Sequence, residues 1–194
     1  MAEPSTLTSL KNKIMKKNVL VFGLIAGVVV SLTMAVGMIT MSKTHKCEMG
    51  TGSMVIGYLS MLVAFSLIYV AVKNFRDKQN GGLISFGKAF KMGLFISLIA
   101  SPMYVIVWAF VYHFYMPDFM DKYAAQMIES AKATASAAEV QQKIAEMDKY
   151  KELYKSPLFF ALMTYAEILP VGLLVSLITG LILKRREVVR SERS

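Results

Sequence analysis

The sequence predicts an all-α, polytopic membrane protein: four transmembrane helices, with an extracytoplasmic helical hairpin between the third and the fourth. Composition supports this class, because 55% of the 194 residues are hydrophobic and only 18% are charged, against about 25% charged in soluble globular proteins. The 11 Phe and 9 Tyr argue against a disordered chain, since a disordered chain is poor in aromatic residues. The single cysteine, Cys47, excludes an intramolecular disulfide framework.

Four long apolar segments are the second observation. A helix needs about 20 apolar residues to cross roughly 30 Å of hydrocarbon. The uncharged segments are 18–42, 49–72, 92–117 and, interrupted only by Glu167, 156–183. They are continuously apolar, whereas strands of a membrane barrel alternate. We predict a transmembrane domain over residues 18–186, with spans at about 18–42, 53–72, 91–116 and 157–183.

The first apolar segment also has features of a cleavable signal peptide, because four Lys precede it in the N-terminal tail. The segment is too long for a typical signal peptide, and no Ala-x-Ala cleavage pattern follows it. We therefore expect an uncleaved membrane anchor, preceded by a basic tail over residues 1–17.

The distribution of basic residues predicts the orientation. Basic residues exceed acidic ones in the N-terminal tail, in the 73–91 loop and at the C-terminus, where Lys184, Arg185 and Arg186 precede the tail 187–194. Segment 117–155, in contrast, has six Lys and seven acidic residues. Four crossings place the three basic segments on one side, which the positive-inside rule makes cytoplasmic. We thus expect a multi-pass membrane protein with both termini in the cytoplasm. The net charge of +9 needs no nucleic acid partner, and it favours contact with anionic lipid.

Segment 117–155 is expected to form the outer hairpin. Its apolar residues recur at helical spacing in two runs, and Ser136 and Glu139 match the capping-box pattern that begins a helix. The hairpin could be a docking surface or a lid. A polar connector that packs on itself is the favoured interpretation.

Small residues recur every fourth position in the predicted spans, which permits close helix packing in a membrane. The positions we expect at helix contacts are Gly23, Gly27, Gly93, Ser97, Gly172, Ser176 and Gly180. Packing within one chain is favoured over homodimerisation. Pro102 and Pro170 lie near mid-span and should bend their helices; the bends could line a cavity or only adjust packing, and both readings stay open.

Glu167 is the residue with the sharpest functional hypothesis. It lies about ten residues into the last span, or roughly 15 Å along the helix. A charged group at such depth is costly and should face protein or water. Tyr104 and, nearer the surface, His113 are candidate partners, as are the hydroxyl residues Thr33, Ser60 and Thr164. Glu167 could be a proton or cation site, or a neutral acid hydrogen-bonded across the bundle, which is slightly favoured.

Other chemistry is sparse. His45 and Cys47 alone seldom make a metal site, and no phosphate-binding loop or hydrolase motif is present. We expect no catalytic residue, no cofactor and no metal, so an enzyme is the least favoured class.

Several motifs resemble those of a bacterial membrane-protein family classed as a domain of unknown function, number 4199. They are Gly57-Tyr58-Leu59-Ser60-Met61-Leu62, Phe65-Ser66-Leu67-Ile68, Phe75-Arg76-Asp77, Gly81-Gly82, Ser85-Phe86-Gly87-Lys88-Ala89-Phe90 and Glu167-Ile168-Leu169-Pro170-Val171-Gly172-Leu173. The resemblance covers about residues 18–186. It implies a four-span inner-membrane protein and supplies no substrate or catalytic residue.

Two functions follow as hypotheses. The leading one is a non-enzymatic structural or accessory membrane component, in contact with the lipid bilayer and with a membrane-protein partner or further copies of itself. The alternative is a small transporter or channel that uses Glu167 as an intramembrane proton or cation site.

Overall fold

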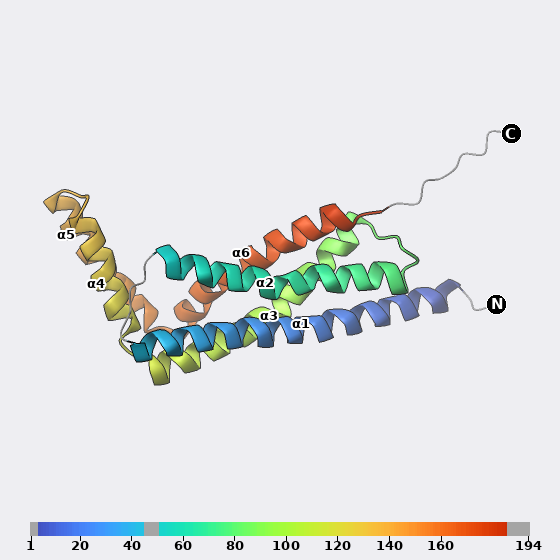
Figure 1. Ribbon diagram of the computed structural model, residues 1–194, viewed down its shortest axis with the longest axis horizontal. Coiled ribbons are helices and arrows are strands. Elements are labelled where there is room, and N and C mark those ends of the chain that lie inside the picture. The colour runs from blue at the N-terminus through green and yellow to red at the C-terminus, as the bar shows by residue number, and fades with distance from the viewer. Residues whose placement is uncertain (1–3, 45–50, 186–194) are drawn as a thin grey trace.

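A computed structural model describes residues 4–44 and 51–185, and these residues are almost entirely helical (Figure 1). The elements are α1 (Pro4–Thr44), α2 (Thr51–Asn74), the π-helix η1 (Phe75–Gln79), α3 (Phe86–Tyr115), α4 (Phe119–Lys132), α5 (Ala137–Tyr154) and α6 (Pro157–Leu183). The described residues form no strand beyond one isolated bridge, between Ile84 and Arg185. The predicted all-α class is confirmed.

Four of the helices are long and apolar enough to cross a membrane. They contain the segments Lys13–Lys43, Val55–Gln79, Phe86–Tyr115 and Pro157–Leu183, which indicates a multi-pass membrane protein. Three helices, α1, α2 and α3, extend beyond the predicted spans. α1 begins at Pro4, within the predicted tail, because lysine is a good helix former and its charge does not end a helix. α3 begins at Phe86, where the side chain of Ser85 accepts a hydrogen bond from the Lys88 amide.

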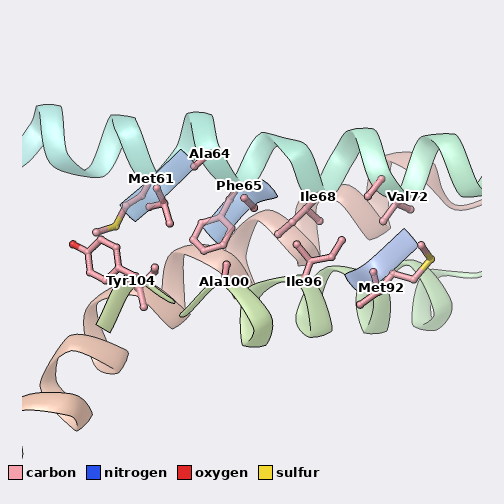
Figure 2. Packing of buried hydrophobic residues seen from close by; sticks show 14 of the residues in the cluster. Met61, Ala64, Phe65, Ile68, Val72, Met92, Ile96, Ala100 and Tyr104 are labelled. Atoms are coloured by element: carbon pink, nitrogen blue, oxygen red, sulfur yellow. The ribbon is translucent and has the colours of Figure 1, made fainter. Parts of the chain in front are cut away.

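The four long helices form a bundle in which α3 packs along α1 on one side and along α6 on the other, while α2 contacts both α1 and α6. Figure 2 shows side chains of α2 and α3 filling the space between these helices. Phe65 and Ile68 of α2 and Met92 and Ile96 of α3 are at most 1% exposed. Close van der Waals packing of this kind is what holds membrane helices together.

The predicted small-residue positions lie at contacts between helices. A Cβ atom built on Gly93 of α3 would lie 2.5 Å from the Oγ atom of Ser176 on α6, and one built on Gly172 would meet Ser97 of α3. These two reciprocal contacts join α3 to α6. The structure therefore uses the small residues inside one chain.

The same holds along α1. A Cβ atom on Gly27 would lie 2.5 Å from the Met103 sulfur of α3, and one on Gly23 would lie 2.9 Å from Ile99. At the far end of α6, a Cβ atom on Gly180 would lie 3.0 Å from the Phe86 ring.

Helices α4 and α5 pack against each other beyond the end of the bundle where α3 finishes and α6 begins, which we call the α4–α5 end (Figure 1). Ser136 and Glu139 make the capping box that the sequence pattern predicts: the Glu139 carboxylate accepts from the Ser136 amide at 2.8 Å. An ion pair between Lys151 and Asp121 joins the two helices at 2.5 Å.

The opposite end, which we call the η1 end, is fastened by a short loop. Gly81 and Gly82 adopt positive φ angles of 66° and 79°, a conformation that suits glycine. Ile84 and Arg185 exchange two backbone hydrogen bonds, of 3.1 and 2.9 Å, between the loop and the end of α6. Arg76 is 8% exposed; it binds the Asp77 carboxylate and donates to the Leu183 carbonyl at 3.4 Å.

Candidate functional site

Glu167 lies on α6, ten residues from its first residue, Pro157. At 1.5 Å per residue this is about 15 Å from the α4–α5 end. The side chain is exposed at the surface of the bundle, although α6 is otherwise almost wholly apolar. A carboxyl group therefore lies at the surface of an apolar helix, about three turns from the first residue of that helix.

A cluster of aromatic rings lies between Glu167 and the α4–α5 pair. Trp108 of α3 donates its indole N–H to the Tyr154 hydroxyl of α5 at 3.1 Å. The Tyr154 ring lies 5.1 Å from that of Phe160 on α6, and Phe119 of α4 meets Trp108 edge-on at 5.0 Å. Edge-to-face pairs at such distances are favourable, so rings from α3, α4, α5 and α6 join the helix pair to the bundle.

The phenol groups of Tyr104 and Tyr154 are the electrostatic neighbours of Glu167. The negative charge of the Glu167 carboxylate acts on both phenols. Tyr104, on α3, is 5% exposed and lies beside Met61 of α2 (Figure 2). Burial raises the pKa of Tyr154 to about 12, although the hydrogen bond from Trp108 acts in the opposite direction. The Tyr154 phenol thus keeps its proton at neutral pH and can serve as a neutral donor.

Glu167 forms neither a hydrogen bond nor an ion pair with any residue in the ranges 4–44 and 51–185. Tyr154 accepts its bond from Trp108, so its own hydroxyl proton is still available. The site is an exposed carboxylate whose charge acts on two phenols, and within the described part of the chain no cation neutralises it.

The other predicted partners of Glu167 lie elsewhere or bond within their own helices. His113 is exposed and packs edge-on against Phe114 at 4.9 Å. It follows Tyr104 by nine residues, which places it about 180° around α3. Its side chain is therefore on the opposite side of the helix from Tyr104.

The hydroxyl residues donate to carbonyls one turn earlier. Thr33 bonds to Val29, Thr164 to Phe160 at 2.9 Å, and Ser60 to Gly57. None of these hydroxyls is directed to Glu167.

The two prolines both lie inside continuous helices, Pro102 in α3 and Pro170 in α6. Pro170 is exposed and Pro102 half-buried. Pro170 therefore faces away from the core, and the two rings do not line a shared space inside the bundle.

The bundle interior between Glu167 and the η1 end is filled. Phe65, Ile68, Val72 and Ile96 are 0% exposed and Met92 is 1% exposed. The buried hydroxyls of Ser97, Ser101 and Ser176 donate to carbonyls of their own helices at 3.0, 2.8 and 2.6 Å. These buried residues pack the bundle interior on the η1 side of Glu167.

Tyr154 and Trp108 are the members of this site that the sequence analysis missed. Tyr154 lies in segment 117–155, for which the sequence predicts a hairpin without predicting contacts to the bundle. Its link to the bundle depends on the tight turn at Ser156-Pro157 that folds α5 back against α6. The i, i+4 spacing of the aromatic residues Trp108 and Tyr112 is the one available signal for an aromatic cluster at this end of α3.

Comparisons with known proteins give one match. A model of the family described as "Protein of unknown function (DUF4199)" matches residues 21–185. Neither the search of curated proteins nor the search of solved structures found a match. Within the described residues, no group of three or more His, Cys, Asp or Glu side chains could hold a metal ion.

Proposed function

The chain belongs to the DUF4199 family of proteins of unknown function, and on that premise we propose that it is a non-enzymatic accessory component of a membrane-protein assembly. Its four apolar helices support a position in the bilayer. The observation that carries the proposal is the surface position of Glu167, above a closed interior. A polar group that faces outward is placed to contact neighbours in the membrane rather than to pass a solute through the bundle.

The proposal includes a location. The chain lies in a bacterial inner membrane with both termini and the η1 end in the cytoplasm, and with α4 and α5 outside. The charge distribution supports this orientation: Lys73, Lys78, Lys88 and Lys91 cluster at the η1 end, whereas Lys and acidic residues nearly balance in α4 and α5.

A small transporter or channel is the second proposal, and one observation favours it. Glu167 is exposed and has two phenols as neighbours, which is a suitable setting for a proton or a cation. A transporter must also connect this site to the η1 end. The fully buried Phe65, Ile68 and Ile96 stand in that path, so this function requires the bundle to rearrange.

The assembly state in native membranes tests the accessory function. A tagged chain produced at its natural level is extracted in a mild detergent, and its size is compared with that of the purified chain in the same detergent. We expect the native extract to contain a species larger than the purified chain by at least one further protein. A native species of the same size as the purified chain contradicts an accessory role.

A further inference from the structure

Placing a charged side chain near the middle of a bilayer costs about 2.5–3.5 kcal/mol of free energy on insertion scales, and such residues usually face protein or water. Glu167 is exposed, and the ranges 4–44 and 51–185 supply it with no cation and no hydrogen bond. Within the described residues, no group of the chain compensates the cost of placing this carboxylate in the membrane in its charged form.

The surface around Glu167 is suited to another helix. Met163, Glu167, Pro170 and Leu174 follow the spacing i, i+4, i+7, i+11, so they form one stripe along α6. We call these four residues the Glu167 face. Met163 is half-buried and the other three are exposed, Leu174 by 52%. An apolar stripe with one acid at its centre matches the contact surface of a single transmembrane helix.

We propose that the Glu167 face binds a transmembrane helix of a partner protein that carries one Lys or Arg at the depth of Glu167. This inference rests on the accessory function proposed above and deepens it by naming the chemistry of the partner. The basic group forms an ion pair with the Glu167 carboxylate, which supplies the cation that the described part of the chain lacks.

Charge complementarity selects this occupant over a second copy of the chain. The four apolar segments, 18–42, 49–72, 92–117 and 156–183, contain neither Lys nor Arg. A second copy would therefore bring only another carboxylate to this depth. Like charges at close range repel, and a pair of acids would have to share protons. A partner with a Lys or Arg in its membrane span provides a counter-charge for the Glu167 carboxylate, and the carboxylate does the same for that basic side chain.

Synthetic transmembrane peptides test the inference directly. The full chain is purified into lipid nanodiscs, and binding of a fluorescent Leu/Ala helix is measured by energy transfer. One peptide carries a single Lys ten residues from the end that inserts beside α4 and α5, and a second carries Leu there. We expect the Lys peptide to bind at least about tenfold more tightly, a preference of about 1.4 kcal/mol.

Variants assign the preference to the carboxylate. Glu167→Gln should abolish the preference for the Lys peptide, and Glu167→Asp, which keeps the charge, should retain it. Glu152→Gln is the matched control, because Glu152 is an exposed acid of α5 outside the apolar helices, and it should change nothing. The Asp variant keeps the test decisive if the Gln variant folds poorly.

Equal binding of the two peptides, or a Lys preference that survives in Glu167→Gln, would overturn the inference. So would stable dimers of the chain alone that Glu167→Gln disrupts, since a second copy would then occupy the face. Equal peptide binding together with a large native assembly refutes only the basic partner helix. Lys-specific binding without such an assembly refutes only the accessory function.

Discussion

Glu167 sets the chemistry of this molecule because it is an ionisable residue within an otherwise apolar α6. In the isolated chain its carboxylate has no cationic partner among the described residues. Replacing it by Gln keeps the shape and removes the charge. We expect Glu167→Gln to have a melting temperature in detergent at neutral pH equal to or above that of the parent.

Differential scanning fluorimetry of the two purified proteins measures this difference, and Glu152→Gln serves as a surface control. A melting temperature several degrees lower in Glu167→Gln alone would mean that the charged form is held by a cation or by water. That result would favour the transport site.

Single residues were predictable where local chemistry decides the outcome. The Ser136–Glu139 capping box follows from a four-residue pattern, since both groups that it pairs lie within one turn. The surroundings of Glu167 were less predictable. Tyr104 was predicted as a neighbour of Glu167 from its depth in the membrane. His113, nine residues further along α3, lies on the opposite side of that helix from Tyr104, and Tyr154 belongs to α5. Such contacts depend on how one helix is rotated about its axis relative to the other, and the residue spacing within either helix does not determine that rotation.

Helix contacts through small residues are the main feature at the scale of elements. Gly172 packs against Ser97, so a large side chain there must push α6 from α3. We expect Gly172→Leu to lower the free energy of unfolding by about 1–3 kcal/mol, the usual cost of overpacking. Gly37→Leu is the control, since a Cβ atom there meets nothing within 4 Å. Unfolding in a denaturing detergent measures both, and equal stability of the two variants would refute the packing role.

The start of α5 should depend on pH. The amide and hydroxyl of Ser136 donate to the Glu139 carboxylate, which lowers the pKa of that carboxyl group. A depressed acid pKa means that the bonds stabilise the helix start above the unfolded pKa of about 4.3 and are lost as the pH falls through the folded pKa. Hydrogen exchange at the first amides of α5, corrected for intrinsic rates, should show protection that decreases below about pH 4.

Glu139→Gln should flatten this pH dependence, whereas Glu129→Gln, on α4 outside the capping box, should leave it unchanged. Protection that stays constant to pH 3 in the parent would mean that the capping bonds do not hold the helix start.

The limits of the elements show which signals the sequence carries. Each predicted span overlaps one of the four helices that are long and apolar enough to cross a membrane, because the bilayer sets the apolar length. Charge marks the membrane border and not the helix end, so α1 extends back to Pro4 through the lysines. The π-helix at 75–79 was not predicted. Its residue Arg76 is buried and donates to the Leu183 carbonyl of α6, a contact that the local sequence does not show.

At the scale of the whole molecule, the orientation of the bundle is open to direct measurement. With Cys47 replaced by Ser, a cysteine at Ser136 should react with a membrane-impermeant maleimide in intact cells. A cysteine at Gln79, at the η1 end, should react only after lysis. The reverse labelling pattern would invert the orientation and place the η1 end outside.

Glu167 is exposed at the surface of a packed bundle, and we propose that it acts there and not within a transport path. The most direct test is proton and cation flux in proteoliposomes that contain the purified chain, with an imposed gradient and a pH-sensitive dye inside. We expect the same flux for the parent, for Glu167→Gln and for empty liposomes, because the fully buried Phe65, Ile68, Val72 and Ile96 fill the interior. Flux that requires the parent protein and disappears in Glu167→Gln would show that Glu167 lies in a transport path.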